Sequence, residues 1–554
     1  METVKIYCVN TDSEKEIPMG TSLAEMIDIF GVKMPYLIAN AKVNNKTESL
    51  AYKVYRPKRV EFVDISHSSA MRTYIRSLCF ILAKAVNDIV PDSETFLEHP
   101  VEYGFYFEIE APEKVSDETL AEIRKRMHEI VDADFPFQEM EDETKNVVKL
   151  FREGRHEDKA LLLETSDLLY AHYFLLDDYL DYYYGCLTPS TGYIQLFDIH
   201  RYNGGFILQI PMRFNPTMLA PVTAQPKLMS VYKEHLEFLK ISNLDNVGDL
   251  NKANIDGRIS EVIQVAEAYQ AKQISEIADQ ISKKFNEGLR LVLISGPSSS
   301  GKTTFRKRLE VQLRVEKLSP IGLSLDDYFV ERDKTPLDEF GEKDYESLYS
   351  LDLELLESHL LTLFDGNEVE LPCYNFITGK REYRNNRICM TDNTIFIVEG
   401  IHALNPQLTV NITREKKFHI YVSALTAISL DNHNWIPASD NRLLRRLVRD
   451  YRYRGYSGVD TLSRWESVLR GEYKWIFPFQ ENADVMFNSA MIYELAAIRK
   501  HAEPVLQRVP RTAPEYAEAH RLLKFLSYFN YIPDRELPPT SLLREFLGGS
   551  SFRY

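Results

Sequence analysis

Short apolar segments alternate with segments of helical periodicity through the second half of the chain. Apolar runs that predict strands occupy Leu291–Ser295, Ile321–Leu325, Thr394–Val398, His419–Ser423 and Ala483–Asn488. Between the first two runs, Thr304–Lys317 predicts a helix. Continuous apolar strands separated by helices are typical of a parallel sheet that helices cover on both faces. The pattern therefore predicts an α/β fold for residues 286–490.

The first half of the chain has a different pattern. Val4–Val9 alternates apolar and polar residues as a strand does, and Thr21 is placed to cap a short helix at Ser22–Phe30. These features predict a compact α/β domain over residues 1–65. A second, α+β domain is expected over residues 66–212. Its predicted elements are helices at Met71–Val90 and Asp117–Asp132, a strand at Tyr103–Ile109 and a β-rich section at Tyr193–Ile210.

Prolines and polar residues separate the two halves. Three prolines between Pro216 and Pro226 interrupt regular structure, and the helical periodicity of Ile259–Phe285 follows them. We therefore expect residues 213–285 to form a linker with a helical lead-in. Residues 491–554 predict a C-terminal helical extension.

Composition and charge exclude several classes of protein. The 554 residues carry a formal net charge of −16, which argues against broad, sequence-independent binding of nucleic acid. Five scattered cysteines with no CxxC pair predict free thiols in a reducing cytoplasm. We find no signal peptide and no apolar run of about 18 residues, so we expect a cytoplasmic protein without a membrane partner.

The segment Gly296-Pro-Ser-Ser-Ser-Gly301-Lys302-Thr303 matches the eight-residue phosphate-loop pattern between a predicted strand and a predicted helix. Glycines let the backbone turn its N–H groups toward a β-phosphate, Lys302 adds charge near the β/γ bridge, and Thr303 offers a hydroxyl to Mg²⁺. We expect ATP and Mg²⁺ here; the alternative is a ligand-free Gly/Ser-rich turn. The expected nucleotide-binding residues are Gly296, Ser298, Ser299, Ser300, Gly301, Lys302, Thr303 and Thr304.

Acidic residues follow two of the predicted strands. Asp326 comes directly after the second strand and Glu399 after the third. Because the carboxyl ends of parallel strands meet at one edge of a sheet, both acids are expected beside the phosphate loop. We assign Asp326 as the base that accepts a proton from an attacking hydroxyl, and Glu399, with Thr303, to the Mg²⁺ site. The alternative for each acid is a helix cap.

An arginine-rich stretch, NRLLRRLVRDYRYRG, covers residues 441–455. Such a run suits a lid that closes over ATP and neutralises charge on the transferred phosphoryl group. The alternatives are a nucleic-acid-binding helix and a solvated face with i,i+4 ion pairs. Two or three of the arginines are expected to reach phosphate.

Residues 290–490 resemble the uridine kinase and phosphoribulokinase family of P-loop kinases. The landmarks run in family order: GPSSSGKTTF, SLDDYF, LPCYNFITGKRE, VEGIHAL, DNRLLRRLVRD and NADVMFNS. The resemblance implies that Lys302, Asp326, Glu399 and Arg446 are catalytic and that Arg442 binds the nucleotide. It places the nucleoside among Asp344, Glu346, Tyr374, Phe376, Arg381 and Arg454. In the pocket loop, however, Gly379 and Asn375 replace a histidine and an aspartate of uridine–cytidine kinases.

The first half of the chain has its own resemblances. Residues 1–65 resemble the β-grasp TGS domain, and residues 66–212 are similar to the second N-terminal domain of threonyl-tRNA synthetases, including VEYGFYFEIE and FDIHRYNGG. The synthetase domain hydrolyses mischarged tRNA with an HxxxH pair and a later Cys/His pair. Here His67 occupies the first position of the HxxxH pair, but Met71 occupies the position of the second histidine. The later Cys/His pair is assigned to His200 and Gly204. We therefore expect neither editing nor zinc, with His67 and His200 as ordinary polar contacts.

The resemblance to the kinase family implies transfer of the γ-phosphoryl group of ATP to the 5′-hydroxyl of a nucleoside. Uridine is the leading acceptor and cytidine the second, in pyrimidine salvage. The alternatives are an RNA- or tRNA-associated regulatory ATPase, a kinase of another small alcohol, and residual editing. Asp326 and the aromatic loop favour a kinase, because a regulatory ATPase needs no site for a second substrate. A homo-oligomer is expected, and nucleic acid is not an expected partner of the N-terminal half.

Overall fold

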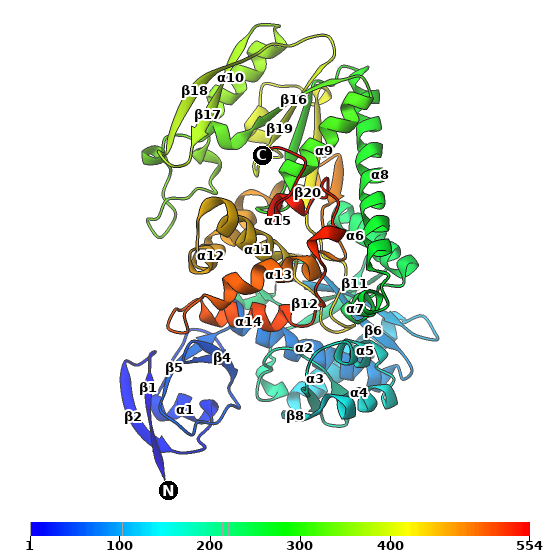
Figure 1. The fold of residues 1–554 in the computed structure, drawn as a ribbon. Coiled ribbons are helices and arrows are strands. Elements are labelled where there is room, and N and C mark those ends of the chain that lie inside the picture. Colours follow the sequence, from blue (N-terminus) through cyan, green and yellow to red (C-terminus); the bar gives the residue numbers. More distant parts are fainter. Residues whose placement is uncertain (1, 102–103, 213–214, 220) are drawn as a thin grey trace.

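The computed structural model describes residues 2–101, 104–212, 215–219 and 221–554 (Figure 1). At the N-terminus, five strands in the order β2-β1-β5-β3-β4 form a mixed sheet in which only β1 and β5 are parallel. Its elements are β1 Thr3–Cys8, β2 Ser13–Pro18, α1 Leu23–Phe30, β3 Ile38–Val43, β4 Lys46–Ser49 and β5 Lys58–Asp64. Ser22, and not Thr21, caps α1, because its hydroxyl and the carboxylate of Glu25 form a reciprocal capping box.

Helix α2 (Ser68–Ile89) organises the next region. It contacts α3 and strands of three different sheets, which explains why it is buried on almost every side. The four-stranded sheet has the order β11-β12-β7-β6 and the three-stranded sheet β10-β9-β8. The remaining elements are β6 Glu94–Val101, β7 Gly104–Glu110, α3 Asp117–Asp132, β8 Phe137–Glu143, α4 Thr144–Glu153, α5 Glu157–Glu164, β9 Tyr170–Leu176, β10 Tyr179–Asp181, β11 Asp198–Tyr202, β12 Gly205–Gln209, β13 Pro211–Met212 and β14 Asn215–Leu219. Tyr103 of the expected strand, and Glu102 of the synthetase-like segment, lie outside the described residues.

Three helices connect this region to the second half of the chain. They are α6 Pro226–Ser242, α7 Val247–Ile255 and α8 Ile259–Phe285. Helix α8 has the predicted bounds and runs along one side of the molecule toward the second half (Figure 1). In the described part of the chain, no helix combines the length and apolar character that a membrane span requires.

A parallel five-stranded sheet, in the order β16-β19-β15-β20-β21, forms the core of the second half. This confirms the predicted α/β fold with a parallel sheet. The sheet strands are β15 Leu291–Ser295, β16 Ser319–Ser324, β19 Thr394–Glu399, β20 Lys417–Ser423 and β21 Val485–Asn488. Around them lie the hairpin β17 Val369–Asn375 and β18 Lys380–Ile388 and the helices α9 Lys302–Val315, α10 Leu353–Phe364, α11 Ala438–Arg449, α12 Gly458–Trp475, α13 Glu494–Gln507, α14 Tyr516–Leu526 and α15 Arg544–Leu547.

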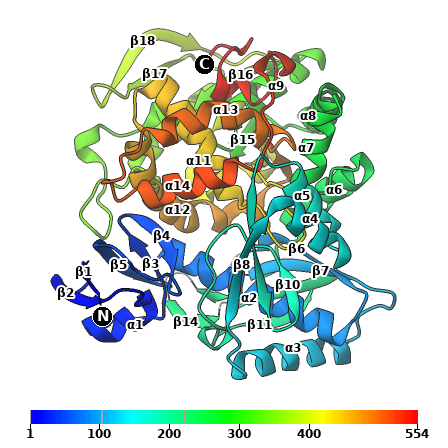
Figure 2. The same cartoon turned by 60° about the horizontal axis from the view of Figure 1, so that its bottom comes forward.

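The two halves of the chain share one hydrophobic core. Leu162 of α5, Leu250 of α7, Leu444 of α11 and Leu522 of α14 belong to the same buried cluster. Helices α11, α13 and α14 lie between the parallel sheet and the N-terminal regions (Figure 2). The halves are therefore packed as one body, and a truncation between them would expose a large apolar surface.

A buried group of charges also joins the halves. Nζ of Lys159 on α5 lies 3.2 Å from Asp158, 3.4 Å from Asp181 and 3.3 Å from Asp431, which precedes α11. His433 adds a 2.7 Å contact to Asp181. Three carboxylates around one ammonium are stable in the interior only while that ammonium is present, because an unpaired buried charge is strongly destabilising.

We predict that Lys159→Met lowers the free energy of unfolding by about 3–5 kcal/mol, because the three carboxylates lose their shared cation. Urea-induced unfolding followed by fluorescence measures this change. The matched control is Lys149→Met, since Lys149 is exposed and its partner Glu153 lies 3.7 Å away. Equal stability of the Lys159 variant and the control would contradict the prediction.

Candidate active site

The phosphate loop connects the central strand β15 to helix α9. Gly296 has φ +154°, and a Cβ atom there would lie 1.9 Å from the carbonyl oxygen of Val422 on β20, so this position requires glycine. Nζ of Lys302 donates to the carbonyl oxygens of Gly296 at 2.8 Å and Pro297 at 3.0 Å. Burial lowers the pKa of Lys302, and nearby carboxylates oppose that shift. The loop thus holds one cation at the N-terminus of a 14-residue helix, an arrangement that attracts phosphate.

Glu399 ends β19 beside this loop. Its Oε1 lies 3.1 Å from Nε of Arg306, and burial raises the pKa of its carboxyl group. Its Oε2 is buried without a hydrogen-bond partner among the described residues. A buried carboxylate oxygen with a free coordination position is an oxygen donor of the kind that Mg²⁺ prefers, and so is the hydroxyl of Thr303, which follows Lys302 in the loop.

No cluster of three or more histidine, cysteine or carboxylate side chains suitable for a metal occurs in the described part of the chain. A Mg²⁺ ion does not need such a cluster, because it usually takes one or two protein oxygens and completes its shell with water and substrate phosphates.

Two adjacent acids at the end of β16 have different environments. Asp327 accepts a hydrogen bond from the backbone N–H of Tyr374 at 3.1 Å and so fixes the start of the aromatic loop. The Asp326 side chain is exposed, and within the described chain its carboxylate has no hydrogen bond or ion pair. It lies within electrostatic range of Lys302 and Arg454. Asp326 is therefore the acid available to a substrate hydroxyl.

The β17–β18 hairpin, which is bound to Asp327 at Tyr374, carries a group of aromatic rings. The ring of Tyr374 lies 5.1 Å from that of Phe376 and 5.6 Å from that of Phe329, and Phe376 is 57% exposed. Arg381 is engaged within the protein: it donates to Asp352 at 3.0 Å and to the carbonyl oxygen of Phe329 at 3.1 Å. Its observed contacts hold the hairpin to the start of α10.

The acidic stretch before α10 supplies two more predicted substrate residues. Asp344 accepts from the N–H of Glu346 at 3.1 Å and stabilises the local turn. Glu346 packs against Gly471 of α12, where a Cβ would lie 2.3 Å from that of Glu346. Burial raises the pKa of Glu346 to about 7, against the attraction of Arg446. Glu346 is thus a carboxyl group that titrates near neutrality at the edge of the site.

The arginine-rich stretch divides into two groups. Arg442 and Arg445 of α11 are buried, 4% and 0% exposed, and form ion pairs of 2.5 Å with Glu472 and Glu494. Both also donate to carbonyl oxygens of the phosphate loop: Arg442 to Ser298 at 3.2 Å and Arg445 to Ser299 at 3.3 Å. These two buried arginines therefore stabilise the backbone of the phosphate loop.

The second group lies further along the same segment. Arg446 donates to the hydroxyl of Ser298 at 2.9 Å and lies 3.3 Å from Asp450. A π-helical turn at Asp450–Arg454 brings Arg449 and Arg454 to the same carboxylate, at 2.9 Å and 3.5 Å. Arg454 is half exposed, so Arg446 and Arg454 are the cations best placed to meet a phosphoryl group.

Sequence reasoning missed Glu472, Glu494 and the C-terminal segment. Glu472 accepts from the loop N–H of Ser298 at 3.1 Å, but a lone glutamate in a helix carries no signal of that role. At the C-terminus, the carboxylate of Glu545 accepts from the backbone N–H of Thr304 at 3.1 Å and from its hydroxyl at 2.5 Å. Thr304 is a predicted phosphate contact, so a carboxylate lies where a nucleotide phosphate is expected. Figure 1 shows the C-terminal end beside α9.

We predict that Glu545→Gln lowers the KM for ATP about threefold to tenfold, because a negative charge at the N-terminus of α9 repels phosphate. Steady-state kinetics at varied ATP concentration measure the effect. Glu536→Gln is the matched control, since Glu536 lies in the same segment and bonds Ser260 instead. An unchanged or higher KM for the Glu545 variant would refute the repulsion.

The residues compared with the synthetase editing motif do not come together as assigned. Nδ1 of His67 accepts from the N–H of Ser69 at 3.1 Å and caps α2, as an ordinary polar contact does. His200 of β11 bonds Gln209 at 2.8 Å and does not line the cavity that contains His67 and Met71. Cys186 lines that cavity instead. The assignment of the later pair to His200 and Gly204 is therefore wrong, because neither residue lines the cavity that contains His67.

Comparison with known proteins follows the same division of the chain. Residues 291–495 match the family model described as the phosphoribulokinase / uridine kinase family. A uridine kinase of Staphylococcus aureus strain JH9 is 30% identical over 197 residues, which cover 35% of this chain and 86% of that kinase. A uridine kinase of Staphylococcus haemolyticus is 29% identical over 197 residues, which again cover 35% of this chain and 86% of that kinase.

A second similarity concerns another 208 residues. A threonine–tRNA ligase of Symbiobacterium thermophilum is 24% identical over that length, which covers 37% of this chain and 32% of the ligase. Among solved structures, D-glycerate 3-kinase from Cryptococcus neoformans aligns with 38% of this chain and 89% of its own, at 13% identity and a TM-score of 0.28.

Proposed function

The chain belongs to the phosphoribulokinase / uridine kinase family and is an ATP-dependent kinase, and from this premise we propose that its acceptor is the 5′-hydroxyl of a nucleoside. Uridine is the proposed first substrate and cytidine the second, within pyrimidine salvage. The observation that carries the proposal is Asp326, an exposed carboxylate, unpaired among the described residues, near Lys302 of the phosphate loop. Its neighbour Asp327 binds the hairpin that carries the buried ring of Tyr374 and the exposed ring of Phe376.

The proposed chemistry assigns one step to each group. Asp326 accepts the proton of the acceptor hydroxyl as its oxygen attacks the γ-phosphorus in line, and ADP leaves. Lys302, Arg446 and Arg454 stabilise the charge on the transferred phosphoryl group. Glu399 and Thr303 would hold Mg²⁺, which, when bound, neutralises charge between the β- and γ-phosphates. Tyr374 and Phe376 stack against the base, which places the hydroxyl near Asp326.

The contacts of the hairpin favour one alternative acceptor class. Nδ2 of Asn375 donates to Glu382 at 2.7 Å, and its Oδ1 accepts from the backbone N–H of Ile377 at 3.0 Å, so its amide serves the turn. Arg381 is likewise engaged with Asp352. Because the side chains of Asn375 and Arg381 are both occupied within the protein, a different small alcohol with an apolar or aromatic body is the second candidate.

We predict that a coupled ADP-release assay with uridine and cytidine shows turnover above the background ATPase rate. Asp326→Asn should lower kcat at least 10²-fold, the scale of a lost general base. Asp392→Asn, an exposed aspartate in a distant turn, is the matched control and should leave kcat unchanged. A loss of less than threefold for Asp326→Asn would remove it as the base, and a panel of nucleosides without turnover would overturn the acceptor class.

We further predict a pH dependence of nucleoside binding. Ionised Glu346 offers two acceptor oxygens to ribose hydroxyls and binds them more strongly than the protonated acid does, and burial raises its pKa to about 7. The KM for the nucleoside should therefore fall as pH rises from 6 to 8, because the ionised fraction increases through that window. Glu346→Gln should flatten this dependence. An unaltered pH profile in the variant would contradict the assignment.

A further inference from the structure

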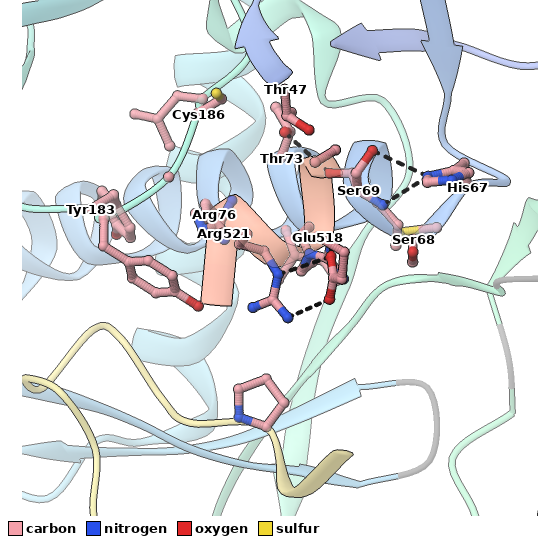
Figure 3. Close-up of a pocket in the computed structure, with 18 of the residues that line it drawn as sticks. Thr47, His67, Ser68, Ser69, Thr73, Arg76, Tyr183, Cys186, Glu518 and Arg521 are labelled. Carbon is pink, nitrogen blue, oxygen red and sulfur yellow. Dashed lines mark hydrogen bonds and ion pairs between the residues drawn. The ribbon is translucent and has the colours of Figure 1, made fainter. Parts of the chain in front are cut away.

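A large cavity lies away from the phosphate loop, where the N-terminal regions meet helices α12 and α14. Its volume is about 1090 Å³, enough for a metabolite-sized ligand. Helix α2, the segment Tyr183–Thr188, α12 and α14 contribute to its walls. Figure 3 labels Arg76 of α2 and Arg521 of α14 among the residues that line it, together with Cys186 and Tyr183. None of these residues takes part in the chemistry proposed above.

Arg76 is the most informative residue of the cavity. It is 7% exposed, and its guanidinium lies over the ring of Tyr184 at 4.8 Å. Throughout the described ranges, no carboxylate pairs with it and no hydrogen bond to it is found. A buried cation without an anion is costly, so its retention in a cavity wall indicates an anionic ligand. Gly185 leaves room for it, because a Cβ there would lie 2.4 Å from the guanidinium carbon.

Lys524 of α14 provides a second cation. It lines the same cavity, and among the described residues its ammonium has no ion pair. Its electrostatic neighbours are Cys186, Arg76, the carboxylate of Glu139 and the ammonium of Lys46. Two neighbouring cations repel each other, and an anion between them would relieve that repulsion.

The other basic residues nearby are already neutralised. Arg72 pairs with Glu518 at 2.7 Å, and Arg521 pairs with Asp440 at 2.6 Å and with Glu518 at 2.5 Å. Lys46 pairs with Glu48 at 2.8 Å. The cations left for a ligand are therefore Arg76 and Lys524, which together match one carboxylate or phosphate group.

Aromatic residues define the rest of the ligand. Tyr184 lies under Arg76, and the rings of Phe105 and Trp435 are 4.2 Å apart on the cavity wall. Such surfaces suit a flat or apolar body. Burial raises the pKa of the Cys186 thiol to about 11, so this cysteine stays protonated and is a poor nucleophile near neutral pH. We therefore assign Cys186 no nucleophilic role in this cavity.

The cavity wall also contacts the support of the phosphate loop. Trp465 of α12 lines the cavity and lies under the guanidinium of Arg442 at 5.5 Å. Arg442 in turn donates to the loop carbonyl of Ser298. On the α11 side, Asp440 is bound by Arg521 of the cavity. A ligand that moves α12 or α14 therefore changes the contacts that position the loop.

We propose that this cavity binds a small organic anion, with a carboxylate or phosphate between Arg76 and Lys524 and a flat apolar body against Tyr184 and Trp435, and that the bound anion alters the affinity of the phosphate loop for ATP. Binding of the anion in the cavity does not depend on which acceptor the kinase uses. Only the proposed effect on ATP affinity rests on the proposal that the phosphate loop binds ATP.

The test uses three probes with the same ring on the full chain: phenyl phosphate, phenylacetate and neutral benzyl alcohol. Isothermal titration in a Lys302→Ala background excludes binding at the phosphate loop. We expect at least one anion to bind tenfold or more tightly than benzyl alcohol, and the two anions distinguish phosphate from carboxylate. Arg76→Met and Lys524→Met should each weaken that binding about tenfold or more, the loss expected for one charge-assisted hydrogen bond. Arg155→Met, at an exposed ion pair, is the control.

Thermal unfolding separates a ligand-binding Arg76 from a structural one. Without ligand, Arg76→Met should have a Tm equal to or above that of the parent chain, because an uncompensated buried charge is removed, whereas Arg521→Met should lower Tm. A lower Tm for Arg76→Met, together with unchanged anion binding in Lys524→Met, would overturn the site. So would anions that bind no better than benzyl alcohol.

The coupling has its own readout. A nonhydrolysable ATP analogue is titrated into the full chain with its native Lys302, with and without the anion. The expected result is a change of threefold or more in its Kd, lost in Arg76→Met. An identical Kd in both conditions would overturn the coupling. Because this assay needs no acceptor, its outcome is distinct from that of the nucleoside assay.

Discussion

The contact between Arg442, Glu472 and the backbone of Ser298 fixes the position of the phosphate loop. Arg442 donates to Glu472 at 2.5 and 2.8 Å and to the carbonyl oxygen of Ser298, while Glu472 accepts from the N–H of the same serine. One buried ion pair thus binds both backbone polar groups of Ser298. Because α11 provides the arginine and α12 the glutamate, these two helices set the shape of the loop.

The position of the phosphate loop therefore depends on helices and segments from several parts of the chain. Helix α11 packs in the core shared by both halves, and its first turn is bound through Asp440 to Arg521 of α14. Helix α12 forms part of the wall of the large cavity through Trp465. The C-terminal segment reaches the loop from another side, where Glu545 contacts Thr304. A change in the N-terminal regions can therefore reach the phosphate loop through packed helices, without passing through the solvent.

Local patterns in the sequence were sufficient for the parts of the fold that depend on local physics. The apolar runs predicted the parallel strands, the periodicity of Ile259–Phe285 predicted α8, and the glycines of the phosphate loop have the backbone geometry that their positions required. Features that depend on distant contacts could not be predicted in this way. The partner of Arg442 lies 30 residues away, and that of Thr304 lies 241 residues away. The arginine-rich stretch predicted a lid but not that Arg442 and Arg445 are buried supports.

We have proposed that this site transfers a phosphoryl group to a nucleoside hydroxyl. Phosphorus-31 NMR of the full chain with uridine, ATP and Mg²⁺, recorded over time, tests this reaction directly. We predict a phosphomonoester resonance, coupled to the two 5′-methylene protons, that grows in step with ADP. Growth of ADP with inorganic phosphate alone, and no phosphomonoester, would contradict it.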